Sequence, residues 1–215
     1  MSDEVRKGEP WGRPVSGPPD ATVAGGDADL AQAAARLPGR RIAFIASASS
    51  DLARALGMSG ADRELPVDGL QWDGAFALNA VVLGTAPDRM RSWSRGRQLV
   101  VRVDGRERFA GRATAVVVAN GQYLRGNDLV PRGHPGDGRV EVQVYALRPG
   151  ERGEMRRRLR RGDHLPHPRI HAAAGARVDV TVEGRPLPVE ADGLARGRAG
   201  RLTVEVVPAA VWLRL

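Results

Sequence analysis

The stretch VVVANGQYLRGNDLVPRGHPGDGRVEVQVYAL, residues 116–147, decides the fold predicted for this chain. It begins with an apolar run that is typical of a strand. It ends in a second strand-like run, which opens after Asp137-Gly138. Asn-Gly and Asp-Gly pairs such as these favour turns, because both residue types tolerate the backbone angles that turns require. We therefore predict strands over 111–120 and 138–147 with an irregular connection between them.

Further strand-like segments follow the same pattern through most of the chain after residue 64. Val178, Val180 and Val182 alternate with polar residues, as expected for a half-buried antiparallel strand. Only one helix is predicted in this part, around 150–162. The remaining strands are predicted at 74–84, 97–105, 176–184 and 200–215.

The first part of the chain has a different pattern. Apolar runs at 21–24 and 40–47 alternate with helix-like segments at 29–36 and 49–58, which predicts a parallel α/β unit. The run at 40–47 is continuously apolar, so we expect that strand to be buried on both faces. The segment 49–58 has serine near its N-terminus and Gly57 near its end, as helices commonly do.

Together these segments predict an α+β fold class in which a small α/β piece precedes an antiparallel β-sandwich. The predicted domains are a flexible N-terminal arm over 1–19, a truncated α/β domain over 20–64, and a β-sandwich over 65–215. The last strand, 200–215, is a candidate to return to the α/β domain.

Composition narrows the classes of function. The 215 residues carry a net charge of +8 but only 4% aromatic residues, too few for a stacking platform on single-stranded nucleic acid, so we expect no nucleic-acid partner. There is no cysteine, and therefore no disulfide or thiolate site. No apolar run is long enough to span a membrane, and the N-terminal residues lack a secretory signal, so we expect a cytoplasmic protein.

The order and spacing of several motifs resemble the bacterial diacylglycerol kinase family, which includes the sphingosine-kinase-like lipid kinases. In that family an apolar strand is followed by Asn-Gly-x-Tyr, Gly, Pro and Asp-Gly. Here these residues are Asn120, Gly121, Tyr123, Gly126, Pro131, Asp137 and Gly138. The segments 160–170 and 190–215 also resemble the family, and 23–37 lies where the family has its Gly-Gly-Asp-Gly-Thr loop. The resemblance covers residues 20–215.

The resemblance implies a kinase that transfers the γ-phosphoryl group of ATP to a lipid hydroxyl with the help of Mg²⁺. The nucleotide would lie between the two domains, the lipid would enter an apolar cleft of the β-domain, and a homodimer is implied as a possible assembly. The residues carried over for cofactor binding are Gly25, Gly26, Asp27, Ser49, Ser50 and Asp51. Those carried over for the ligand cleft are Asn79, Asn120, Tyr123 and His164, with Asp137 for a metal ion.

The phosphate loop departs from the family at two positions. Ala28 and Asp29 replace the expected Gly-Thr after Gly25-Gly26-Asp27. A Cβ at residue 28 obstructs close backbone approach. Asp29 places a negative charge beside the expected phosphate, where like-charge repulsion amounts to about 1 kcal/mol or more.

The other catalytic parts are also altered. The second loop, IASASSDLAR, has lost the family's Pro, its glycines and its Asn. Leu194 stands where the family has the Glu that serves as general base, which leaves Asp192 as the candidate catalytic carboxylate. Only about 20 residues precede the glycine loop, so part of the family's nucleotide-binding domain is missing from this sequence.

These departures predict a pseudokinase, or a repurposed protein, that binds a lipid or other apolar small molecule in the interdomain cleft. The alternative is an active ATP-dependent lipid kinase, and ATP and Mg²⁺ are cofactors only in that case. A third hypothesis is a module for anionic membrane surfaces, acting through the arginines at 156, 157, 158, 160 and 161.

Three smaller features have two interpretations each. Asp137 is either a Mg²⁺ ligand or simply part of an Asp-Gly turn. His167 and His171 have the spacing of a metal pair on a helix, but prolines flank His167 and argue against a helix. The tryptophans at 72, 93 and 212 are expected to be packing residues rather than recognition anchors.

Overall fold

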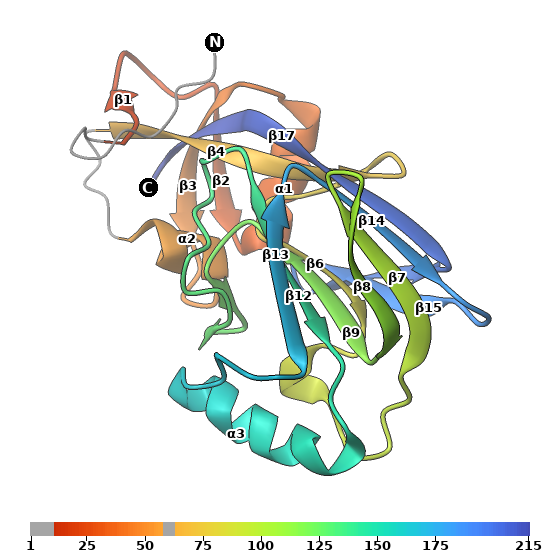
Figure 1. Cartoon of the computed structure of the whole chain (residues 1–215). Coiled ribbons are helices and arrows are strands. Elements are labelled where there is room, and N and C mark those ends of the chain that lie inside the picture. Colours follow the sequence, from red (N-terminus) through yellow and green to blue (C-terminus); the bar gives the residue numbers. More distant parts are fainter. Residues whose placement is uncertain (1–10, 58–62) are drawn as a thin grey trace.

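The computed structural model describes residues 11–57 and 63–215, which form two large packed β-sheets, a separate two-stranded sheet and an α/β unit at one end (Figure 1). The N-terminal ten residues of the predicted arm lie outside the described residues. The helices are α1 (Asp27–Arg36), α2 (Asp51–Leu56) and α3 (Arg152–Arg161), with short 3₁₀ turns at Pro87–Arg89 and Pro149–Glu151. No described helix has the length and apolar character needed to span a bilayer.

The larger sheet runs through both parts of the molecule. Its central path, in spatial order, is β1 (Arg13–Pro14), β4 (Arg63–Trp72), β17 (Arg201–Arg214), β14 (Arg177–Val182), β7 (Arg97–Val103) and β8 (Arg106–Ala113). β5 (Ala75–Ala77) pairs with β4, while β3 (Arg41–Ala46) pairs with β17 and also with β2 (Ala21–Gly25). This sheet is therefore antiparallel at one end and parallel at the other.

β17 is the strand that joins the two ends. Its first half pairs antiparallel with β14, with Arg177 opposite Glu205, and its second half pairs parallel with β3, with Trp212 opposite Arg41. Between these halves its register with β4 shifts, and Ala209 adopts a positive φ of 47°. Such a bulge bends the strand and lets it serve both parts.

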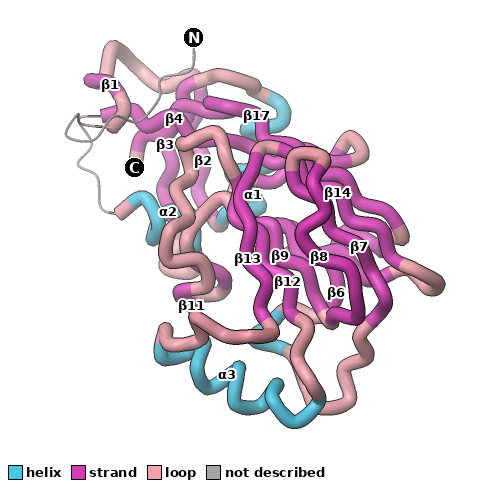
Figure 2. The backbone as a smooth tube through the Cα atoms, viewed as in Figure 1, coloured by secondary structure: helices cyan, strands magenta, loops and turns pink. Residues whose placement is uncertain are grey.

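The second sheet covers one face of the first and closes the sandwich (Figure 2). Its order is β13 (Ile170–Gly175), β12 (Val140–Tyr145), β9 (Ala115–Ala119), β6 (Ala80–Gly84), β15 (Leu187–Ala191) and β16 (Leu194–Ala199). Alternate valines of both sheets are fully buried between them. This pattern confirms the α+β class with a β-sandwich predicted from the alternation.

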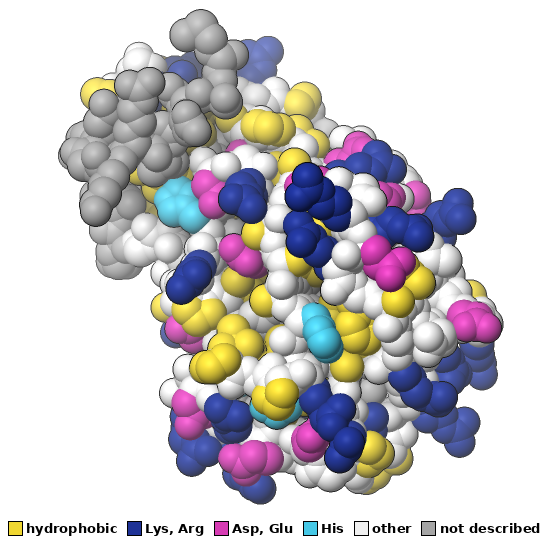
Figure 3. Space-filling view, viewed as in Figure 1, with side chains coloured by type: hydrophobic (Ala, Val, Ile, Leu, Met, Phe, Trp, Pro, Cys, Tyr) yellow, Lys and Arg dark blue, Asp and Glu magenta, His cyan; other side chains and the backbone are white. Residues whose placement is uncertain are grey.

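The outer face of the second sheet is covered by α3. Met155 and Leu159 of α3 are buried against apolar residues that point outward from β6, β9 and β12. β9 and β6 are therefore buried on both faces, which explains why their sequences are continuous apolar runs rather than alternating ones. In Figure 3, basic and acidic side chains are mixed on the surface at the lower end of the molecule, where α3 lies.

The α/β unit has its own core. Leu30 of α1 and Leu52 of α2 are fully buried against β3 and the ends of β4 and β17. The prediction that strand 40–47 is buried on both faces is wrong, because its residues alternate in burial and Ile45 is 63% exposed. One face of β3 packs on the helices, while the side chain of Ile45 points outward.

Two predictions of strand boundaries are also corrected. The apolar segment 74–84 is not one strand but β5 and β6, which belong to different sheets and are separated by Leu78 and Asn79. The predicted strand 111–120 likewise combines the end of β8 with β9, which belong to different sheets. Most of β8 and all of β4, β13, β15 and β16 were not predicted; proline and glycine interrupt β4, and charged residues are frequent in β8 and β16. Within the predicted arm, β1 pairs with β4.

Candidate functional site

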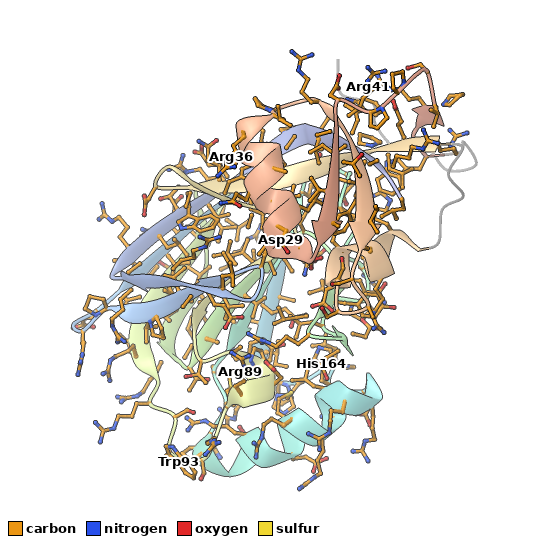
Figure 4. The ribbon with its side chains drawn as sticks, turned by 180° about the vertical axis from the view of Figure 1, so that it is seen from behind. Asp29, Arg36, Arg41, Arg89, Trp93 and His164 are labelled. Atoms are coloured by element: carbon orange, nitrogen blue, oxygen red, sulfur yellow. The ribbon has the colours of Figure 1, made fainter. Side chains whose placement is uncertain are left out.

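A cavity of about 460 Å³ lies where the α/β unit meets the sandwich. It is bounded by the N-termini of α1 and α2, the break between β5 and β6, and two turns, one between β10 (Tyr123–Leu124) and β11 (Asn127–Asp128) and one between β15 and β16. Figure 4 shows Asp29 at the start of α1, the helix whose N-terminus bounds the cavity. The lining residues are Gly26, Asp27, Ala28, Ser49, Asp51, Arg54, Asn79, Leu124, Arg125, Gly126, Asp192 and Gly193.

The glycine turn before α1 is retained, but a carboxylate of the chain itself occupies the place where a phosphate would be expected to bind. Gly25 has a φ of +139°, and a Cβ there would collide with the carboxylate of Asp29. The Gly26 N–H donates to Asp29 Oδ2 at 2.9 Å, so Asp29 caps the helix to which it belongs. A helix N-terminus of this kind would otherwise attract a phosphate.

The N-terminus of α2 is capped in the same manner by Asp27. This carboxylate is 8% exposed and accepts hydrogen bonds from Ser50 Oγ and from the N–H groups of Asp51 at 3.1 Å and Leu52 at 3.2 Å. Ser50 Oγ in turn accepts the N–H of Ala53 at 3.0 Å. Burial raises the pKa of Asp27 to about 6, against the opposing effect of the Ser50 hydroxyl.

Asp51, the first residue of α2, holds the β10–β11 turn over the cavity. Its carboxylate accepts the N–H groups of Arg125 and Gly126, the latter at 2.7 Å. The Arg125 guanidinium forms ion pairs with Asp88, at 2.8 Å, and with Glu190. The carboxylate of Asp51 is therefore engaged in positioning a loop, and the Arg125 guanidinium is paired with two other carboxylates.

Asp192, the candidate base, serves as an anchor in the structure. It adopts a positive φ of 47° in the β15–β16 turn. Its carboxylate accepts three backbone N–H groups from the β5–β6 break, those of Leu78 at 2.8 Å and of Asn79 and Ala80 at 3.0 Å each. Burial raises the pKa of Asp192, while these hydrogen bonds oppose the rise. Leu194, at the expected position of the base, is 50% exposed.

The two asparagines of the predicted ligand cleft have different roles. Asn79 lines the cavity, and its Nδ2 donates to the carbonyl of Tyr123 at 3.1 Å. Its Oδ1 is buried and has no hydrogen-bond partner among the described residues. Asn120 lies deeper, and its Nδ2 donates to the carbonyls of Asp68 and Leu78 at 2.9 and 2.8 Å. Asn120 therefore ties strands together instead of facing a ligand.

His164 and Asp137 do not join the other predicted residues. His164 is fully buried near α3, with Nε2 2.9 Å from the carbonyl oxygen of Leu129, and burial lowers its pKa. Asp137 is exposed and accepts the N–H of Arg139 at 3.0 Å, as in an Asp-Gly turn chosen for backbone reasons. Residues 11–57 and 63–215 contain no group of three or more His, Cys, Asp or Glu side chains that could hold a metal ion.

Sequence reasoning did not assign any cation to this site. Arg54 of α2 lines the cavity with its guanidinium 5.7 Å from the centre of the Tyr123 ring, and it forms no ion pair within the described part of the chain. Arg125 was also missed, although it lies in the stretch that decides the fold. Arg54 ends the segment IASASSDLAR, which was matched to the family, but its side chain was not assigned to the site. Arg125 follows the matched Tyr123 and was not assigned to the site either.

ATP and Mg²⁺ do not fit this arrangement. The helix N-termini already bind Asp27 and Asp29, and the oxygens of Asp27, Asp51 and Asp192 face hydrogen-bond donors of the chain. A magnesium ion requires oxygen ligands that are free to coordinate it. A polyphosphate would meet carboxylates where it needs amide donors.

Comparison with known proteins agrees with the architecture. Residues 79–214 match the family model of the YegS C-terminal NAD kinase beta sandwich-like domain. Among curated proteins, none matches the sequence. A candidate diacylglycerol kinase from Bacillus anthracis str. Sterne has a similar solved structure, with a TM-score of 0.76, 17% identity, and coverage of 91% of this chain and 77% of that one.

Two other solved structures show the range of the similarity. A diacylglycerol kinase structure from Bacillus anthracis str. Sterne gives a TM-score of 0.71 at 19% identity, with 91% and 77% coverage. An NAD kinase from Archaeoglobus fulgidus, solved with ATP, gives a TM-score of 0.50 at 16% identity, with 87% and 74% coverage. At these identities the likeness shows the fold alone.

Proposed function

We propose that this chain, which belongs to the family of the YegS C-terminal NAD kinase beta sandwich-like domain, is a pseudokinase: it keeps a diacylglycerol-kinase-like fold and binds a lipid or other apolar small molecule without transferring a phosphoryl group. The ligand would occupy the cavity between the α/β unit and the sandwich. Its volume of about 460 Å³ suits a small organic molecule or part of a larger one.

The observation that carries the proposal is the internal capping of both helix N-termini at the cavity. A helix N-terminus supplies the equivalent of about half a positive charge, so one carboxylate more than offsets it. Asp29 neutralises α1 and Asp27 neutralises α2. Against these fixed negative charges, a phosphate about 4 Å away would be repelled by up to about 4 kcal/mol at the effective dielectric of a protein surface.

The preference for a weakly charged ligand follows from which polar groups of the cavity wall are free to bind a ligand. The carboxylates of Asp27, Asp51 and Asp192 are occupied by backbone donors, so they offer little to a ligand. Leu124 and the methyl group of Ala28 supply apolar wall, and Arg54 supplies a donor for a carbonyl or hydroxyl group. Most of the polar groups in this wall are therefore bonded within the chain, which leaves few of them free to orient a small organic molecule.

An active lipid kinase is the second candidate, and one feature favours it. The turn at Gly25-Gly26 keeps the positive φ at Gly25 that a phosphate-binding loop uses. This candidate requires the Asp29 carboxylate to leave the Gly26 N–H when nucleotide binds. It also requires a general base at another position, because Leu194 cannot accept a proton. It therefore predicts measurable affinity for Mg-ATP.

Isothermal titration with Mg-ATP separates the two candidates. We expect no binding up to millimolar nucleotide by the folded protein, and clear binding would overturn the pseudokinase proposal. A double variant, Ala28→Gly with Asp29→Thr, restores the family loop and serves as the comparison. If the internal cap is what excludes nucleotide, this variant gains affinity for Mg-ATP.

The ligand is tested by native mass spectrometry of the purified protein and by a blocking variant. Ala28→Leu places a larger side chain on the cavity wall, while Ala35→Leu makes the same change farther along α1, outside the cavity. We expect the first variant to lose a co-purifying small molecule that the second retains. Loss in both variants, or retention in both, would contradict the assignment of this cavity.

A further inference from the structure

A second cavity, of about 520 Å³, lies at the other end of the sandwich, between the start of α3 and the loop before β7. Figure 4 shows Trp93 in this loop beside α3, far from Asp29. We refer to this cavity as the arginine pocket, because its lining includes Arg95, Arg112, Arg148, Arg152 and Arg169. None of the lining residues is acidic.

The positive charge of the arginine pocket is largely uncompensated. Glu151, outside the lining, accepts a hydrogen bond from Arg169 Nε at 3.0 Å. The arginines at 95, 112 and 148 form no ion pair within the described part of the chain, and their side chains are exposed. A concave surface with several guanidinium groups and a single carboxylate, already paired with Arg169, attracts anions, and arginine recognises phosphate by paired hydrogen bonds.

Arg152 gives the pocket a fixed, buried cation. It is only 5% exposed, and its Nη1 donates to the carbonyls of Ser92 at 2.7 Å and Ser94 at 2.5 Å. Its Nε is buried and has no hydrogen-bond partner among the described residues. A buried guanidinium that contacts only carbonyl oxygens keeps its charge, so an anion bound in the pocket would compensate it electrostatically.

Trp93 stands exposed at the rim of the arginine pocket. The expectation that it is a packing residue is wrong, because it is 70% exposed and its ring is 5.2 Å from the Arg91 guanidinium. An exposed tryptophan beside arginines is suited to a membrane interface, where the ring enters the headgroup layer.

The neighbouring α3 contributes less than its sequence suggests. Glu154 forms ion pairs with Arg157 and Arg161, and Asp163 lies within 4 Å of Arg158 and Arg161. The arginine run that the sequence indicated for membrane contact is therefore partly neutralised within the helix and its end. The unpaired charges next to an exposed tryptophan lie in the arginine pocket instead.

We propose that the arginine pocket binds the phosphate group of an anionic lipid headgroup and that Trp93 inserts into the same membrane surface. The lipid phosphate would accept hydrogen bonds from the exposed arginines and lie over the buried Arg152. This site is separate from the cavity of the proposed function and does not depend on the ligand bound there.

Vesicle sedimentation tests the proposal with a matched pair of variants. Arg112→Gln with Arg148→Gln removes two charges from the pocket, while Arg106→Gln with Arg108→Gln removes two unpaired charges from the same strand as Arg112, toward its far end. On phosphatidylcholine vesicles containing phosphatidic acid, we expect the pocket variant to bind about tenfold or more weakly and the control variant less than about twofold more weakly. Equal losses of vesicle binding in the two variants would mean that only net charge matters, and this would overturn the proposal. Absence of vesicle binding by the unaltered protein would overturn it too.

Tryptophan fluorescence distinguishes the source of the phosphate. Brominated lipids should quench Trp93, and the quenching should be lost in Trp93→Phe while vesicle binding persists at reduced strength. Inorganic phosphate, titrated at constant ionic strength, should compete with vesicles for the unaltered protein. A response to inorganic phosphate without any vesicle binding would overturn the lipid assignment and leave a site for soluble phosphate compounds.

Discussion

Replacing Asp27 by asparagine should change how the stability of this protein depends on pH. Burial raises the pKa of Asp27 from its usual value of 3.8 to about 6 in the folded protein. The folded state therefore binds this proton more tightly than the unfolded state. The resulting stability is fully present below about pH 4 and is lost as the pH rises toward about 6.

The magnitude follows from the size of that pKa difference. A rise of about two units corresponds to about 3 kcal/mol of unfolding free energy lost between acid and neutral pH, of which about 2 kcal/mol falls between about pH 4.5 and about pH 7.5. Asp27 is 8% exposed, so solvent screening reduces this value little. The asparagine variant keeps an oxygen acceptor for the α2 amides but cannot ionise.

Urea unfolding of both proteins at a series of pH values measures this difference. We expect the unfolding free energy of Asp27→Asn to decline less between acid and neutral pH, so that the two curves diverge by about 2 kcal/mol. Asp179→Asn is the control of opposite sign, because the hydrogen-bonded Arg177 lowers the pKa of Asp179 and its contribution is lost as the pH falls. Parallel curves for the unaltered protein and Asp27→Asn would refute Asp27 as a buried internal cap.

Three further substitutions test the structural roles assigned here, each by urea unfolding. Asp192→Ala should lower the unfolding free energy by about 2–4 kcal/mol, because three backbone N–H groups at the β5–β6 break lose their acceptor. A loss below about 1 kcal/mol would contradict this anchoring role and make Asp192 a candidate base again. Ser50→Ala should lower it by about 1 kcal/mol through loss of the α2 cap, and an unchanged value would argue against that cap. Gly69→Ala should lower it by about 1–3 kcal/mol, because the new Cβ collides with the Phe76 ring. An unchanged value would show that this ring is not held in place there.

The architecture was accessible from the sequence because its strands carry strong local signals. The alternation of Val178, Val180 and Val182 reports one buried face, and β14 has both of its neighbours antiparallel. The strands that escaped prediction lack this signal. β16, for example, is exposed along most of its length, so burial imposes no pattern on it.

The site was accessible only in part, and the reason is physical. Most of the glycine-loop residues and Asp192 do gather at one cavity, as the resemblance implied. What the sequence could not supply is the direction of each carboxylate. Whether Asp27 faces a nucleotide or caps α2 depends on the placement of Ser50, which lies 23 residues away in the sequence and is brought close by the parallel pairing of β2 and β3.

The internal caps also explain how the fold can remain stable without nucleotide. The first N–H groups of a helix have no partner within that helix, and in a nucleotide-binding fold a bound phosphate can satisfy them. α2 is only six residues long, too short to be stable without capping and packing. Asp27 supplies the cap from within the chain, and Asp29 does the same for α1. A fold that depended on ATP for these contacts would gain stability with each increment of nucleotide. Here the N–H groups of Gly26, Asp51 and Leu52 are already bonded to carboxylates in the free protein, so ATP bound through them would have to replace existing hydrogen bonds and would gain little in exchange.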